Sequence, residues 1–441
     1  MLKKTFISFT SMKTSHKLTA FLVILVVATI GTYLLVGSHA ASPYTSTTAD
    51  SGTHSSGAVT CPSTATNDGN SVVFTSPVAM DGNVALGLSC PGTPFAASSF
   101  WNTPLPSDTP LNTNNAAYSN VIAYNLCHDY PVESTPPSPC STPTYDGSLA
   151  STAWSAPLYV VPANQPYVPV QPYCSSGTTP PRGFANILTP GVPIPADAHA
   201  AAGTDEEVQI YQPSSNKYWD FWQFQQDGSG NWQACFGGLI NNVSGSDGIV
   251  PSGLGALSTG LPLLGGVVRT EELEAGQIDH VIGLELPDML SQSVVPANTS
   301  GTTNGISWPA TRSDGVSTDP LAVPEGLRFR LPPGLNLAQY DLSPIAMAIA
   351  VAAQKYGFVL FEQTGVTTGN VQIDLGDSTT YTTADLANPY TTGPGVGGVN
   401  DGNKGLFDGV LFGSVASVIM NNFPWSQLQA LPFNYGEPSG S

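Results

Sequence analysis

Residues 207–240 read EVQIYQPSSNKYWDFWQFQQDGSGNWQACFGGLI and contain the clearest strand signals in the chain. Three apolar and aromatic runs are separated by the polar segments PSSN and DGSGN, which are typical of short hairpin turns. The spacing predicts a three-stranded antiparallel meander. The whole chain supports this class, because only 10% of its 441 residues are charged and it contains 45 Gly and 39 Pro. We therefore expect a mainly β fold, an antiparallel β-sandwich or jelly-roll-like domain with a few short helices.

One strong helix signal interrupts the β pattern. The segment PIAMAIAVAAQKY, residues 344–356, begins with Pro and is followed by Gly357, with either Asp341 or Ser343 as N-cap. Its Ala-rich and almost uncharged sequence predicts a helix buried on several sides. The following GFVLFEQTG predicts a return to strand.

The N-terminal segment predicts export. A basic stretch, MLKKTFISFTSMKTSHK, precedes about twenty mostly apolar residues, and Ser38-His39-Ala40 suits signal peptidase. The apolar run is also long enough to span a bilayer. Residues 1–40 are therefore a signal peptide or an uncleaved membrane anchor. Both alternatives predict a protein secreted or held at the outer face of the cytoplasmic membrane, with membrane contact only through this segment.

Charge disfavours one class of partner. The chain has a net charge of −19, and four of its 12 basic residues but none of its 31 acidic residues lie within residues 1–40. The exported part is therefore even more acidic than the whole. Such a surface repels phosphate backbones, so we expect no nucleic-acid partner.

Six cysteines lie in the exported part, and an even number predicts disulfides in an oxidising compartment. The sequence leaves fifteen pairings open. Closeness along the chain favours Cys61–Cys90 and Cys127–Cys140, which leaves Cys174–Cys235.

Composition divides the exported part in two. Residues 41–94 are rich in Ser, Thr and Gly, whereas 95–441 form the main β-rich domain. The opening ASPYTSTTADSGTHSSGAV and the later NDGNSVVF resemble the first strands of a carbohydrate-binding jelly-roll module, in which Glu usually stands at the position of Asp50. The resemblance implies a remnant of such a module, and a simple stalk is the alternative.

Residues 269–286, RTEELEAGQIDHVIGLEL, contain a histidine in an apolar context. We expect a short helix capped by Thr270 and ended by Gly276, followed by a strand over 278–286. A period of two places His280 with the apolar face and Asp279 on the other face. His280 is either a packed core histidine or a general base at the floor of a cleft. Any carboxylate partner then comes from another strand, with Asp220 the first choice.

The strand KYWDFWQF carries the second candidate. Asp220 shares a face with Trp222, and a carboxylate beside an indole is typical of surfaces that bind sugars. The alternative is an ordinary sandwich-core strand, whose two faces are also aromatic. If the site is catalytic, we expect His280 as base and Asp220 as its partner.

The scarce arginines complete the candidate set. Arg328 and Arg330 share one face of GLRFRLPP, where they could clamp a carboxylate, and Arg269 precedes the His280 segment. A solvated strand face explains the first two equally well. The sequence contains no GxSxG, Walker, HExxH or CxxC motif, and His280 has no companion at metal-ligand spacing. We therefore predict no metal and no cofactor.

Several motifs occur in an order that resembles a family of exported bacterial proteins of unassigned biochemical function. They are WDFW, GGVVRTEELEAGQIDH, AAQKYG and the terminal FPW, and the match extends from about residue 95 to 431. Members typically read GRIDHAL and WEFW, so Asp279, His280 and an acidic residue at 220 fit the pattern, whereas Gln277 and Val281 depart from it. The resemblance implies one exported domain and brings no catalytic residues with it.

Two functions remain open from the sequence. Export, the WDFW strand and an inward His280 predict a cell-envelope or extracellular protein that binds, and in one version cleaves, polysaccharide. The acidic, Ser/Thr/Gly-rich N-terminal stretch and the missing catalytic motifs favour the alternative, a non-catalytic adhesin or wall-associated structural protein.

Overall fold

The computed structural model describes residues 58–62, 70–74, 92–126, 148–150, 154–175, 177–251, 254–269, 272–273, 276–299, 304–365, 371–376, 420 and 422–438. The first two segments pair as an antiparallel hairpin of β1 (Ala58–Pro62) and β2 (Asn70–Phe74). The expected export segment, residues 1–40, lies outside the described residues. Within the described part of the chain, no helix combines the length and apolar character needed to cross a bilayer.

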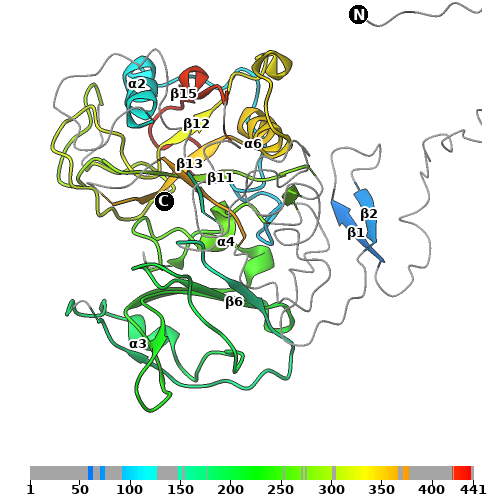
Figure 1. The fold of residues 1–441 in the computed structure, drawn as a ribbon, viewed down its shortest axis with the longest axis vertical. Coiled ribbons are helices and arrows are strands. Elements are labelled where there is room, and N and C mark those ends of the chain that lie inside the picture. The colour runs from blue at the N-terminus through cyan, green and yellow to red at the C-terminus, as the bar shows by residue number, and fades with distance from the viewer. Residues whose placement is uncertain are drawn as a thin grey trace, which may run out of the picture.

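A mixed six-stranded sheet is the larger of the two main sheets (Figure 1). Two of its strand pairs, β11–β13 and β14–β3, are parallel, and the others are antiparallel. In spatial order the strands are β15 (Gln429–Ala430), β12 (Arg328–Arg330), β13 (Phe358–Gln363), β11 (Ile282–Leu286), β14 (Gln372–Asp374) and β3 (Ser148–Ala150).

The predicted meander lies in a second, four-stranded sheet. Its order is β10 (Phe236–Asn241), β7 (Lys217–Trp222), β6 (Val208–Gln212) and β4 (Leu158–Val160). The β6–β7 and β7–β10 pairs are antiparallel, so the predicted meander is confirmed. Its last segment breaks before Phe236, and the residues before the break join a three-stranded sheet of β5 (Val170–Pro172), β9 (Trp232–Ala234) and β8 (Gln225–Gln226).

The expectation of purely antiparallel sheets is wrong. In addition to β11–β13 and β14–β3, the pairs β4–β6 and β5–β9 are parallel. Parallel neighbours need long crossover connections, and the chain between β11 and β13 contains the longest helix of the described part. The mainly β character with few helices is confirmed. The sandwich or jelly-roll arrangement is not confirmed and stays a prediction.

That helix, α6 (Pro344–Lys355), forms where the sequence predicts it. Ser343 is the N-cap, and its Oγ accepts the backbone N–H of Ala346 at 3.1 Å. Gly357 follows the helix with φ +83°, a left-handed conformation that favours glycine. The other helices are α2 (Asn115–Asn125), α3 (Phe184–Ile187) and α4 (Leu263–Gly266), with 3₁₀ turns η2 (Pro213–Ser215), η3 (Val243–Gly245), η5 (Leu337–Tyr340) and η7 (Trp425–Gln427).

Three clusters of buried apolar residues pack against the sheets and helices. The first fills the space between one face of the six-stranded sheet and the helices α2 and α6. The second lies between the two main sheets, where Tyr218 and Ile240 pack in the same cluster as Val359 and Phe361. The third covers the far face of the four-stranded sheet beside α3. Figure 1 shows α2 and α6 at one end of the molecule and β6 with α3 at the other.

A bulge changes the register between the parallel strands β11 and β13. Leu284 pairs with Leu360, but the next residue, Glu285, pairs with Glu362, so Phe361 is the extra residue. The Phe361 ring packs into the cluster between the sheets. Gly283 leaves room for this ring, because a Cβ at that position would lie 2.7 Å from a carbon of it. The bulge therefore makes Glu285 and Glu362 neighbours on adjacent strands.

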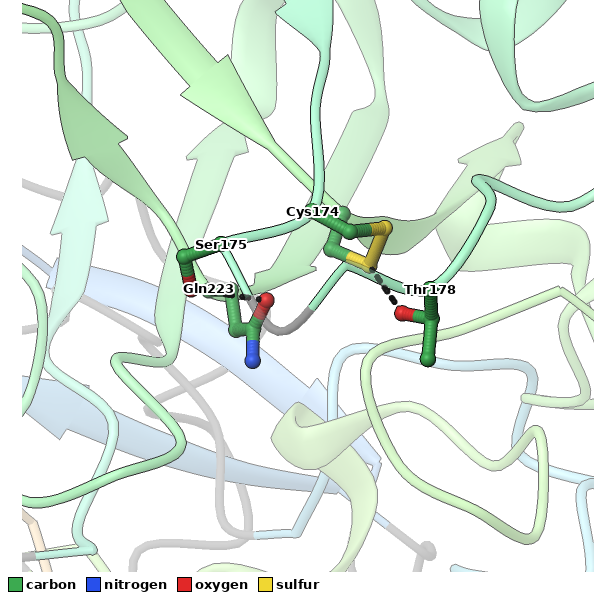
Figure 2. Close-up of a disulfide and its surroundings, with 5 residues drawn as sticks. Cys174, Ser175, Thr178 and Gln223 are labelled. Atoms are coloured by element: carbon green, nitrogen blue, oxygen red, sulfur yellow. Dashed lines mark hydrogen bonds between the residues drawn. A yellow bond between two sulfur atoms is a disulfide. The ribbon is translucent and has the colours of Figure 1, made fainter.

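One predicted disulfide is present in the described residues. Cys174 and Cys235 are joined, with Cα atoms 4.4 Å apart (Figure 2). Thr178 contacts the Cys235 sulfur at 3.6 Å, and Ser175 donates to the Gln223 side chain at 3.1 Å. The disulfide thus ties the loop after β5 to the junction between β9 and β10. The other two expected pairs each include a residue outside the described part of the chain.

We predict that Gly283→Ala lowers the free energy of unfolding by ~1–3 kcal/mol, because the added methyl group overlaps the Phe361 ring. Urea denaturation of the purified protein measures this change. Gly334→Ala is the matched control, since a Cβ there meets nothing within 4 Å. Equal stability of the two variants would contradict the packing described for the bulge.

Candidate functional site

A cavity of about 910 Å³ is lined by residues of both main sheets and the loops beside them. This volume lies within the ~300–1,000 Å³ usual for ligand pockets. Its lining combines aromatic rings with five carboxyl groups, a combination typical of sites that bind polar organic ligands. The carboxyl groups are Asp205, Glu207, Glu285, Asp314 and Glu362.

The bulge places two of these carboxyl groups side by side. Glu285 and Glu362 are register partners on β11 and β13, and both line the cavity. Side chains that face each other across neighbouring strands are close enough to interact directly. Burial, and next the charge of Asp314, raises the pKa of Glu362 to about 8. Burial and the neighbouring charges of Asp374 and Glu362 raise the pKa of Glu285 well above its usual value.

A glutamine joins Glu285 to a third carboxyl group. Gln372 Nε2 donates to Glu285 Oε2 at 2.9 Å and to Asp374 Oδ1 at 3.1 Å. Burial raises the pKa of Asp374 to about 7, although hydrogen bonds from Glu285 and Gln372 oppose the rise. Two such close acids avoid ionising together. The raised pKa values of Glu285 and Asp374 therefore favour a protonated carboxyl group at this pair.

Ser258 connects Glu362 to a further buried acid behind the wall. Its backbone N–H donates to Glu362 Oε2 at 2.5 Å, and its hydroxyl donates to Glu325 Oε1 at 3.1 Å. Glu325 is fully buried, and burial together with the charges of Glu362 and Asp314 raises its pKa well above the usual value. This part of the wall therefore also favours protonated carboxyl groups at neutral pH.

The four-stranded sheet supplies two aromatic residues of the lining, Trp222 and Phe236. The Trp222 indole N–H donates to Asp205 Oδ1 at 3.0 Å, and its ring meets Phe236 edge-on with centroids 5.8 Å apart. The backbone amide of Gln223 donates to the Asp205 carbonyl at 2.7 Å. The Trp222 side chain and the Gln223 backbone therefore both bind Asp205 and fix its loop against the end of β7. Burial raises the pKa of Asp205, and the indole hydrogen bond opposes the rise.

Arg312 is the single basic residue in the cavity lining that the structure describes. Its Nη2 donates to the carbonyl oxygens of Gly255 and Leu257 at 2.9 and 2.5 Å. Its guanidinium carbon lies 5.3 Å from the centre of the Phe236 ring. The side chain therefore supports the wall of the cavity, and the lining as a whole is strongly acidic.

The structure brings only one of the sequence-predicted residues, Trp222, into this cavity. Asp220 is fully buried beneath the wall, on β7. It accepts hydrogen bonds from the backbone N–H of Ala256 at 3.1 Å and from the Tyr218 hydroxyl at 3.3 Å. Burial raises its pKa to about 6, although several hydrogen bonds oppose the rise. We assign Asp220 to holding the segment after β10 against the sheet.

His280 lies apart from the cavity lining and is fully buried. Its Nε2 is 3.1 Å from Glu272 Oε2, and its Nδ1 is 2.7 Å from the carbonyl oxygen of Val281. The expected partner Asp220 is therefore wrong, and the carboxylate comes from the segment before the strand. The expected strand over 278–286 is also too long, because β11 begins at Ile282.

Arg269 completes a buried ionic group with these two residues. Its Nη2 donates to Glu272 Oε1 at 2.6 Å and to the carbonyl of Gly92 at 2.9 Å, and its backbone N–H donates to Glu272 Oε2 at 3.0 Å. Burial raises the pKa of Glu272, but the charges of Arg269 and His280 outweigh that effect and hold the pKa below its usual value. Asp279 points elsewhere, as expected, and binds Lys355 and Tyr356.

The two strand arginines are also occupied within the chain. Arg328 donates to the Tyr356 carbonyl at 3.1 Å, and Arg330 donates to the carbonyls of Pro106 and Thr109 at 3.0 and 3.1 Å. Both side chains are buried, in contrast to the solvated face that was the alternative. Neither lines the cavity, so we do not place the predicted carboxylate clamp in the candidate site.

The cavity carboxyl groups are not among the residues that the sequence predicts for the site. Glu285 in IGLEL and Glu362 in FVLFEQ are single acids inside otherwise apolar strand sequences. An acid in such a context is rarely buried without a reason. A single acid within an apolar strand sequence could therefore have identified both Glu285 and Glu362 as candidates. Nothing in the sequence, however, shows that the two strands are neighbours.

No family model, curated protein or solved structure matches this chain. The assignment of a function therefore depends on the site itself. In the described part of the chain, His, Cys, Asp and Glu side chains do not form any group of three or more arranged to hold a metal ion.

We predict that Glu272→Gln lowers the free energy of unfolding by ~3–5 kcal/mol, because it leaves Arg269 buried without its counter-charge. The lowered pKa of Glu272 also predicts a pH effect. Its contribution to stability is complete above the ordinary value of 4.5 and is lost as the pH falls through the lower pKa of the folded state.

Denaturant titrations of the wild type and Glu272→Gln across acidic pH measure both effects. Asp279→Asn is the control, since it removes a partly exposed ion pair with Lys355 and should cost at most ~1 kcal/mol. A Glu272 variant as stable as this control would show that the buried group contributes little.

Proposed function

We propose that this protein is an exported glycoside hydrolase that binds polysaccharide in the cavity between its two main sheets. One observation carries the proposal. A carboxyl group with a pKa of about 8, Glu362, lies in a cavity that also presents an ionisable carboxyl group bound to an indole, Asp205 on Trp222. Glycoside hydrolysis generally uses one protonated and one ionised carboxyl group on either side of the scissile bond.

The environments of the two groups suggest their roles. Glu362 keeps its proton at neutral pH and would donate it to the glycosidic oxygen as the bond to the sugar breaks. Asp205 comes from the loop before β6, and the indole N–H favours its ionised form. It would stabilise the positive charge that develops on the sugar or activate the water that attacks it. Trp222 would then have two roles: its indole N–H binds Asp205, and its ring offers a flat apolar face to a sugar.

The charge of the cavity favours a class of substrate. Five carboxyl groups and one arginine line it, and the arginine Nη2 is bound to backbone carbonyls. A uronate would place its carboxylate near the ionised Asp205, which is unfavourable. We therefore propose a neutral or amino-bearing polysaccharide. Export is supported by the Cys174–Cys235 disulfide, because such bonds persist in oxidising compartments.

A non-catalytic envelope protein is the alternative function. The same cavity could hold a glycan without cleaving it, and the sugar would then contact the same aromatic rings. The two functions differ in one measurable quantity, the release of new reducing ends.

We predict that the purified protein releases reducing ends from at least one member of a panel of neutral and amino-bearing polysaccharides. Glu362→Gln and Asp205→Asn should each lower the rate by ~10²–10⁴-fold, because each removes acid–base chemistry while nearly preserving shape. Thermal unfolding of each variant checks that the fold is kept. Glu437→Gln, an exposed residue outside the cavity lining, is the control.

Binding to the panel in affinity gels without any release of reducing ends would contradict the hydrolase and leave the non-catalytic alternative. Equal rates for wild type and both cavity variants would show that any cleavage occurs elsewhere.

The raised pKa of Glu362 predicts the alkaline limb of the pH–rate profile. The proton donor must be protonated, so the rate should be maintained through neutral pH and fall as the pH rises through about 8. Initial rates measured from pH 4 to 10 on the best substrate, in buffers of constant ionic strength, test this. A rate that already falls near the ordinary glutamate value of 4.5 would contradict Glu362 as the acid.

A further inference from the structure

Trp154 lies at the cavity in a backbone conformation that bulky residues rarely adopt. Its φ is +59°, in the left-handed region that favours glycine. Its backbone N–H donates to the Ala202 carbonyl at 2.8 Å, which fixes the residue beside the loop that carries Asp205. The strain is retained although glycine at this position would relieve it.

Packing does not account for the side chain either. The Trp154 side chain is part of the cavity lining, yet the residue is 45% exposed. One edge of the indole rests on Gly203, where a Cβ would lie 2.8 Å from Nε1. The neighbouring glycine thus leaves room for the ring. The indole therefore combines a strained backbone with a largely exposed ring at the cavity, and strained residues cluster at ligand sites.

We propose that the Trp154 indole is a stacking platform for a sugar ring of the bound polysaccharide, next to the ring held at Trp222 and Asp205. This inference rests on the proposed function and adds a second sugar position to it. The flat faces of pyranose rings present C–H groups, and an exposed indole packs against them well. The sugar on Trp154 lies outside the two rings that flank the scissile bond, so the proposal implies a substrate longer than a disaccharide.

The test compares Trp154→Gly, Trp154→Phe and wild type on a hexamer and a dimer of the best polysaccharide in the panel. Trp154→Gly should raise KM for the hexamer about tenfold and change kcat less than about twofold, because a stacking contact is lost while the acid and base remain. KM for the dimer should stay unchanged. Trp154→Phe keeps a ring and should retain most of the affinity.

Stability separates this role from a structural one. Trp154→Gly relieves the left-handed strain but removes the ring contact with Gly203 and adds chain entropy to the unfolded state, so its melting temperature should stay close to that of wild type. A merely structural Trp154 would give a much lower melting temperature and no difference between hexamer and dimer. Tyr173→Ala is the control, because Tyr173 is 46% exposed but does not line the cavity.

Two results overturn the proposal in distinguishable ways. If wild type cleaves the panel but Trp154→Gly matches it on the hexamer, the platform is wrong and the hydrolase stands. If wild type neither binds nor cleaves any member of the panel, the proposed function fails and the platform fails with it.

Discussion

The bulge between β11 and β13 is the constraint on which the rest of the site depends. It adds Phe361 to one strand, so that Glu285 and Glu362 become register partners. Without the extra residue, Phe361 would oppose Glu285, and the side-chain alternation of β13 would direct Glu362 to the helix-covered face of the sheet. The bulge is itself held by packing, since the Phe361 ring lies over the bare backbone of Gly283 and fills the cluster between the sheets. The packing of Phe361 on Gly283 thereby determines that Glu362 faces the cavity.

The buried charges of the molecule fall into two kinds. Around His280, the carboxylate of Glu272 is compensated by Arg269 and hydrogen bonds, and its pKa is lowered. Around the cavity, several carboxyl groups such as Glu285 and Glu362 gather beside a single arginine, Arg312, and their pKa values rise. The first arrangement stabilises the ionised form and suits a structural role. The second arrangement favours protonated carboxyl groups beside a space large enough for a ligand. Acids with shifted pKa values in a cavity are typical of functional sites.

Local features of the fold could be predicted from the sequence, and pairings between distant segments could not. The β6–β7–β10 meander has polar turns between aromatic runs, and α6 has its Ser343 cap and Gly357 stop, so short-range signals suffice. The segment around His280 has a strand-like pattern, yet the Val281 amide bonds the Trp101 carbonyl and the ladder starts one residue later. The parallel pairs and the bulge depend on contacts between segments whose order in space has no local signal. Glu272, the partner of His280, is close to it in the sequence, but no local pattern shows which acid of that segment faces the imidazole. Contacts of this kind bring the lining of the cavity together. For that reason Trp222 alone, among the lining residues that the structure describes, was predicted from the sequence.

The central claim is that the bulge places in the cavity a Glu362 that keeps its proton at neutral pH. The most direct measurement is a pH titration by carbon NMR of protein labelled with ¹³C at the glutamate carboxyl carbons, with the Glu362 signal assigned from its loss in Glu362→Gln. The structure predicts a midpoint near 8 for this signal. A midpoint near the ordinary value of 4.5 would contradict the claim and, with it, the assignment of Glu362 as the acid.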